Sequence, residues 1–174
     1  MGRVGAIFCA AALAAACGSD TPTTPGSNQP NTLIFTAQLS AASEVPPVTN
    51  ADVNARGTAT ITFTVTRDSA GTITGGTVSF NYSLNGFPAG TTIRAAHIHE
   101  GAAGVAGGIR VDTGLSAANA VTLAADGTGS ITATQGSPDV PTLQAIVANP
   151  GSYYFNVHSA LNPGGAVRGQ LVRQ

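Results

Sequence analysis

The chain has 174 residues, of which only 9% are charged and none is lysine. A formal net charge of −1 without a basic cluster excludes the usual kind of nucleic-acid-binding surface. Beyond residue 17, no apolar run approaches the ~18–20 residues that a membrane-spanning helix needs. Both cysteines, Cys9 and Cys17, lie in the first 17 residues, so the rest of the chain has neither a disulfide nor a thiolate metal site.

The N-terminus has the pattern of an export signal. Residues 1–16 are expected to be a signal peptide, because Arg3 precedes an apolar stretch that ends in small residues. Cys17 follows, and the arrangement resembles the lipobox of bacterial lipoproteins, although Leu13 lies four places before the cysteine instead of three. Residues 17–31 are expected to be a lipid-anchored flexible linker, since 18–31 contain no apolar residue. The protein is expected in the cell envelope, where the lipid alone would hold it to the membrane. The alternative is cleavage after Ala16 and secretion.

Residues 32–174 are predicted to form one all-β domain, because short apolar runs alternate with turn residues. The turn Asp68 to Gly71 is expected to join the two strands of a hairpin, whose second strand ends at the turn Asn85-Gly86. Asp126-Gly127 predicts a second hairpin. A short helix is expected over 141–148, with Asp139 near its start. The prediction is an antiparallel sandwich or Greek-key barrel of about eight to nine strands. The expected strands are 33–39, 57–67, 78–84, 93–100, 109–113, 120–125, 129–134, 153–159 and 166–172.

All three histidines are predicted to point away from the core, because side chains alternate along a strand. Ile98 is the core residue of its strand, which turns His97 and His99 outward together. Val157 is a core residue of a later strand, which turns His158 outward. If these strands adjoin, the three imidazoles share one face. The same alternation supplies a polar cluster around them, whose candidate members are Glu44, Glu100, Asn156, Arg168 and Gln170.

The His-x-His spacing can chelate one metal ion, because it places the two Cα atoms ~6.5–7 Å apart on one side of a strand. His158 would complete a set suited to copper or zinc, with water in the open position. An ion would draw the nitrogens to within about 3–4 Å of each other. The alternative is a network in which the three histidines hydrogen-bond with Asn156, Glu44 or backbone and hold loops in place. Arg168 nearby opposes a cation and favours an anion or a carboxylate partner such as Glu44 or Glu100.

Catalysis is not expected. Ser159 follows His158 directly, so the two side chains face opposite ways and cannot act as a dyad. Glu44 and Glu100 are the only glutamates, which gives no support for a glycosidase. The glycine-rich segment 101–108 has no lysine and no following helix, so it is not a phosphate-binding loop; it is expected to form a lip over the histidines.

Three motifs in order resemble the CHRD domain, first described in chordin and found in many bacterial exported proteins. They are Leu39 with Glu44-Val45-Pro46-Pro47, then 97–101 (HIHEG), then 156–158 (NVH) with 163–171 (PGGAVRGQL). Together they span residues ~33–172. The resemblance carries no defined activity. The leading hypothesis is a non-catalytic binding module of the cell envelope, with an extracellular protein, a polysaccharide or an ion as ligand. A purely structural envelope protein, which would differ only by lacking a ligand, is a further alternative.

A more distant likeness is to copper/zinc superoxide dismutase, a Greek-key barrel that also uses histidines one residue apart. The corresponding residues are His97, His99 and His158, with Arg168 near the C-terminus. The enzyme's bridging histidine, further zinc ligands and disulfide have no counterpart, which excludes a two-metal dismutase. The alternative function is therefore a mononuclear copper or zinc protein.

Overall fold

The computed structural model describes residues 1–2, 31–136 and 138–174 of the chain. Most of the predicted signal peptide, Cys17 and the linker up to residue 30 lie outside the described residues. In the described ranges, no helix has the length and hydropathy needed to cross a lipid bilayer.

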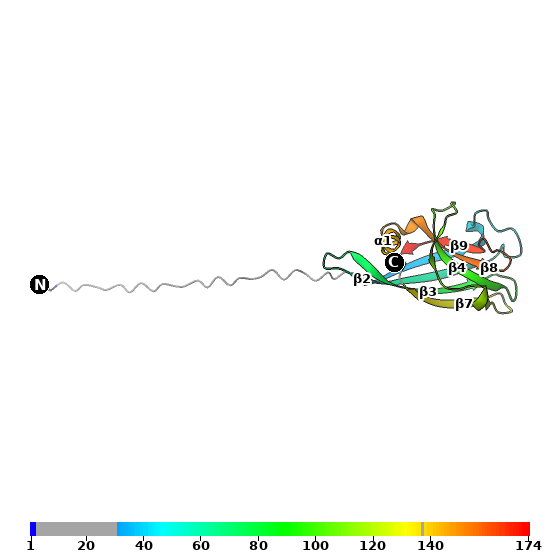
Figure 1. Cartoon of the computed structure of the whole chain (residues 1–174), viewed down its shortest axis with the longest axis horizontal. Coiled ribbons are helices and arrows are strands. Elements are labelled where there is room, and N and C mark those ends of the chain that lie inside the picture. Colours follow the sequence, from blue (N-terminus) through cyan, green and yellow to red (C-terminus); the bar gives the residue numbers. More distant parts are fainter. Residues whose placement is uncertain (3–30, 137) are drawn as a thin grey trace.

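Ten antiparallel strands form one sheet that curls into a nearly closed barrel (Figure 1). This confirms the predicted all-β antiparallel fold. The main path of the sheet runs β5-β4-β8-β9-β1-β2-β3-β7, while β10 pairs with β1 and β6 pairs with β4. The strands are β1 (Thr32–Ser40), β2 (Arg56–Arg67), β3 (Ile73–Asn85), β4 (Thr92–Glu100), β5 (Ile109–Asp112), β6 (Val121–Thr122), β7 (Gly129–Gly136), β8 (Tyr153–Ser159), β9 (Val167–Gln170) and β10 (Val172–Arg173).

The barrel interior is filled by the apolar alternates of these strands. On β2 the residues 57, 59, 61, 63 and 65 are buried while the intervening threonines face outward, as the alternation predicts. Aromatic rings fill the centre: Phe35 meets Phe63 edge-on, and Phe80 and Tyr82 pack against Phe155. Burial of this apolar surface is the main stabilising contribution to the fold.

Helix α1 (Val140–Ala148) lies where a helix was expected and packs against β3. Asp139 caps it by accepting a hydrogen bond from the backbone N–H of Thr142. Leu143 and Ile146 are buried, and Gln144 donates to the carbonyl of Ile73. Three 3-10 turns complete the elements: η1 (Ala41–Ser43), η2 (Ala117–Asn119) and η3 (Pro150–Ser152).

The predicted hairpin around Asp126-Gly127 is wrong. The turn forms, with Gly127 at φ 74°, but the expected strand 120–125 shortens to β6, which pairs with β4, whereas β7 pairs with β3. The reason is Leu123, whose side chain is buried and whose N–H donates to Thr91 beside β4. The expected last strand also divides at the buried Leu171, so that β9 pairs with β8 and β10 with β1.

Candidate metal centre

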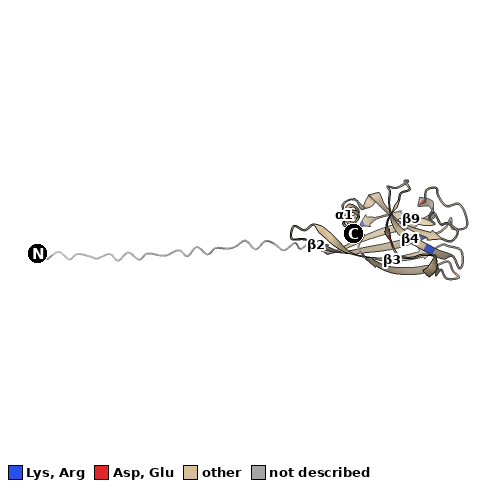
Figure 2. Cartoon of the chain, viewed as in Figure 1, with Lys and Arg blue, Asp and Glu red and all other residues tan. Residues whose placement is uncertain are grey.

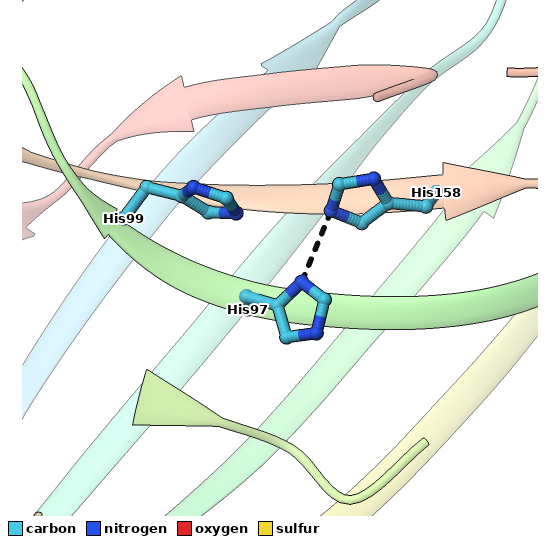
Figure 3. Close-up of side chains that lie close together, drawn as sticks. All are labelled: His97, His99 and His158. Carbon is cyan, nitrogen blue, oxygen red and sulfur yellow. Dashed lines mark hydrogen bonds between the residues drawn. The ribbon is translucent and has the colours of Figure 1, made fainter. Parts of the chain in front are cut away.

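The sheet brings all three histidines onto one outer face of the barrel. His97 and His99 lie on β4, and His158 lies on β8, which is the neighbouring strand. Asn156 is the cross-strand partner of both His97 on β4 and Arg168 on β9. Figure 3 shows the three imidazoles gathered over these strands, with His97 and His158 in contact. The adjacency on which the predicted site depends is therefore present.

The ring nitrogens converge but stand slightly too far apart for a bound ion. His97 Nδ1 lies 3.1 Å from His158 Nε2. One nitrogen from each of the three rings lies within 4.8 Å of the others. Bonds of about 2.0–2.1 Å from one ion would hold the nitrogens about 3.3–4.2 Å apart. The spread exceeds the expected 3–4 Å, and a rotation that moves one ring by about 1 Å would close it.

This outer face is covered by loops, so the histidines are buried although they point away from the core. Their exposed fractions are 9% for His97, 8% for His99 and 7% for His158. Burial lowers the pKa of all three imidazoles, and that of His158 falls to about 4, with a further contribution from a charge on His97. All three are therefore neutral at pH 7, and each keeps a nitrogen lone pair.

Two backbone carbonyls fix which nitrogen of His99 and His158 carries the proton. His99 Nδ1 lies 2.9 Å from the oxygen of Gly107, and His158 Nδ1 lies 3.0 Å from that of Pro163. Because a carbonyl oxygen only accepts, each Nδ1 is the N–H donor and each Nε2 presents a lone pair. Metal-binding histidines are held in this way by a hydrogen bond from the other ring nitrogen.

The third ring, His97, has competing partners. Its Nε2 lies 3.8 Å from the Asp112 carboxylate, which favours a proton on that nitrogen. Its Nδ1 faces the lone pair of His158 Nε2 at 3.1 Å, which also demands a proton. A neutral imidazole carries only one N–H. A metal ion held by His97 Nδ1, His99 Nε2 and His158 Nε2 would remove the conflict, because the single proton of His97 could then lie on Nε2, opposite Asp112.

Arg168 is buried beside this cluster. It is 2% exposed, donates from Nε to the carbonyl of Ser43, and donates from Nη1 to that of Val105 at 3.0 Å. Its guanidinium carbon lies 4.5 Å from the ring centre of Tyr154, which stacks on the ring of His99. The arginine charge contributes to the lowered pKa of His99.

Glu44 also reaches the site, from the loop after η1. Burial raises its pKa to about 7, and the charge of Arg168 opposes that rise. Glu44 and Asn156 both lie close to Gly165. A Cβ at this position would be 2.6 Å from Glu44 Oε2 and 2.8 Å from Asn156 Nδ2. Gly165 has φ 139°, so both space and backbone conformation favour glycine there. The expected Arg168–Glu44 ion pair does not form among the described residues, where Arg168 donates to carbonyls instead.

Glu100 does not join the cluster, contrary to the prediction. It pairs with Arg110 at the surface, and both side chains are about half exposed. Glu100 follows His99 directly, so strand alternation turns it to the other side. Gln170 lies at the margin of the cluster, where its side chain donates to the carbonyls of Gly101 and Gly151.

The segment 101–108, which is predicted to form a lip over the histidines, contacts His99 and its neighbours on the outer face. Four side chains of the outer face hold it: His99 and Tyr154 bond to Gly107, Arg168 to Val105, and Gln170 to Gly101. A pocket of about 440 Å³ opens beside the segment, lined in part by Glu44, Arg168 and Gln170.

Sequence reasoning missed several residues of the site. Tyr154 alternates with Asn156 and His158, so the same parity argument could have placed it on the outer face. Asp112 was not connected with His97 because the pairing of β4 with β5 was not known. Gly107 and Pro163 contribute through backbone oxygens, which leave no side-chain signal.

The comparisons with known proteins concern the family and not the ligand. The family model of the CHRD domain matches residues 35–171. No curated protein and no solved structure matches the chain. The family match suggests a non-catalytic binding module. The likeness to copper/zinc superoxide dismutase stays a prediction, since neither finding bears on it.

Proposed function

The chain belongs to the CHRD domain family, and from this premise we propose that it is an exported, lipid-tethered binding module whose ligand is one copper or zinc ion. The ligand atoms are His97 Nδ1, His99 Nε2 and His158 Nε2. Imidazole nitrogen is a suitable donor for both metals. The module acts by holding the ion, and no catalytic step is assigned to it.

The observation that carries the metal proposal is the orientation of the imidazoles. The carbonyls of Gly107 and Pro163 accept hydrogen bonds from Nδ1–H of His99 and His158. The freed Nε2 of His99 is buried and has no hydrogen-bond partner among the described residues. A buried acceptor without a partner costs about 1–3 kcal/mol. In a purely structural network this nitrogen would be expected to accept a hydrogen bond. In a metal site its lone pair must be free to bind the ion.

Metal binding at this site requires little proton exchange. The three imidazoles are neutral at pH 7 because burial lowers their pKa values. The ion would displace only the proton between His97 and His158, and this proton could move to His97 Nε2 opposite Asp112. Uptake above about pH 7 should therefore release almost no protons.

The metal proposal is tested with the purified chain in which Cys9→Ser and Cys17→Ser remove both thiols, because thiols also bind copper and zinc. This chain should take up about one ion of copper or zinc. His158→Gln should lower the affinity at least 100-fold, because glutamine keeps hydrogen-bonding capacity but lacks the imidazole lone pair. Thr62→Ala on the barrel's outer face serves as the matched control and should bind like the parent.

Trace, substoichiometric metal in the parent would overturn the metal proposal, as would equal uptake by His158→Gln.

The tether is tested separately. Labelling of cells with a palmitate analogue should mark the chain, and Cys17→Ala should abolish the label. A Cys17→Ala chain that still carries the label would contradict the lipid anchor.

A further inference from the structure

The ligand set of the proposed site carries no negative charge. Its three donors are neutral imidazoles, and the group contains neither a carboxylate nor a thiolate. Charged residues are sparse along the described strands as a whole (Figure 2). An ion bound here would therefore keep its full charge in a buried position, which is costly unless opposite charge lies nearby.

The buried arginine near the proposed site has a charge of the same sign as a metal ion. Arg168 is buried, and its charge acts on His99. It cannot easily turn away, because its Nε and Nη1 donate to the carbonyls of Ser43 and Val105 and its guanidinium carbon lies over the ring of Tyr154. Tyr154 lies on β8, between the strands of His99 and Arg168. Repulsion between the guanidinium and a bound ion grows in proportion to the charge of the ion.

The two carboxylates in the region offer little compensation. Asp112 faces the far nitrogen of His97 at 3.8 Å, and its side chain is 62% exposed, so water screens it. Glu44 is buried near Arg168, and burial raises its pKa to about 7, so its negative charge at neutral pH is incomplete. A divalent ion would thus lie in a neutral to positive environment.

The number of donors points in the same direction. The described residues supply three nitrogens beneath the covering loops. Zn²⁺ completes a tetrahedron with a fourth ligand, and Cu²⁺ prefers a tetragonal set of four or more. Cu⁺ has a filled d shell like Zn²⁺ but only half the charge, so it tolerates three neutral nitrogens without an anionic or fourth ligand.

We infer that the site selects Cu⁺ over Zn²⁺ and Cu²⁺, because a buried guanidinium lies beside an all-imidazole, three-donor ligand set. This inference rests on the proposed metal site and narrows its ligand to the monovalent ion. Arg168 is then a specificity-determining residue, which acts through its charge and touches no metal.

The test measures affinities for Cu⁺, Cu²⁺ and Zn²⁺ by chelator competition, with Cu⁺ handled anaerobically, in the Cys9→Ser/Cys17→Ser chain. The parent should bind Cu⁺ at least about 100-fold more tightly than Zn²⁺ or Cu²⁺. Arg168→Gln should raise the affinities for the divalent ions about tenfold relative to Cu⁺, the direction that loss of one nearby positive charge requires. Arg168→Lys should keep the parent's preference. Arg110→Gln, which removes an exposed arginine, is the matched control and should change nothing.

Binding of Zn²⁺ or Cu²⁺ as tight as that of Cu⁺ in the parent would overturn the selectivity inference while the proposed metal site stands. This comparison needs no variant, so it decides the question even if Arg168→Gln fails to fold. Binding of none of the three ions would remove the metal site itself. An unchanged preference in folded Arg168→Gln would show that Arg168 does not set the selectivity.

Discussion

The outer faces of two pairs of neighbouring strands differ in burial: the face of β2 and β3 is mostly exposed, and the face of β4 and β8 is mostly buried. Strands β2 and β3 bury one face in the barrel and expose threonine, serine and asparagine on the other. Strand β8 is buried along its whole length, and so is β4 from Ala96 to His99. The difference lies in the loops, which cover β4 and β8 and leave β2 and β3 open. Burial of polar side chains costs free energy unless hydrogen bonds or a ligand compensate for it.

The comparison predicts that residues on the inner face of β8 contribute strongly to the free energy of unfolding. Phe155 is fully buried and packs on Phe80 and Tyr82. Phe155→Ala should lower the free energy of unfolding by about 3–5 kcal/mol, because it leaves a large cavity. Urea unfolding of the metal-free chain measures this. Phe155→Leu, the milder control, should cost less than about 1.5 kcal/mol, and equal losses in both variants would contradict the cavity explanation.

The contribution of the covered face to stability should instead depend on pH, and Glu44 provides the test. Since burial raises its pKa from 4.5 to about 7, the folded protein keeps a proton on Glu44 in this range that the unfolded chain releases. The stability linked to this proton is lost as the pH rises through the window. Glu44→Gln is neutral at every pH, so its stability relative to the parent should increase by about 1–2 kcal/mol between about pH 5 and pH 8.

Urea unfolding of both chains at the two pH values gives this difference, and the histidine contributions cancel because both chains share them. A relative stability that stays constant, or that falls with rising pH, would show that Glu44 is not a buried carboxyl of raised pKa.

The open face of β2 should be the least sensitive region. Thr60 is exposed, and so is its cross-strand neighbour Asn81 on β3. Thr60→Ala should change the free energy of unfolding by no more than about 0.5 kcal/mol, as is usual for surface substitutions. A loss above about 1 kcal/mol in urea unfolding would mean that the two halves of the barrel differ less than their burial indicates.

Strand alternation predicted much of this arrangement. It gave the two faces of β2 and the outward direction of His97, His99 and His158, because side-chain period follows from local backbone geometry. It could not give the burial of the histidines, since the loops that contact them, through Gly107 and Pro163, are far apart in sequence and contact them through backbone oxygens. Strand pairing was equally hidden: Asp126-Gly127 forms its turn, yet the core position of Leu123 sends the preceding segment to β4.

The most direct test of the account is the imidazole ¹⁵N NMR spectrum of the Cys9→Ser/Cys17→Ser chain before and after one equivalent of diamagnetic Cu⁺ or Zn²⁺. Without metal, His99 and His158 should carry their protons on Nδ1. With metal, the resonances of His97 Nδ1, His99 Nε2 and His158 Nε2 should shift together, while Nδ1 of His99 and His158 stays protonated and the proton of His97 moves to Nε2. Protons on Nε2 of His99 and His158, or no shift with either ion, would contradict the claim that these rings form one metal centre.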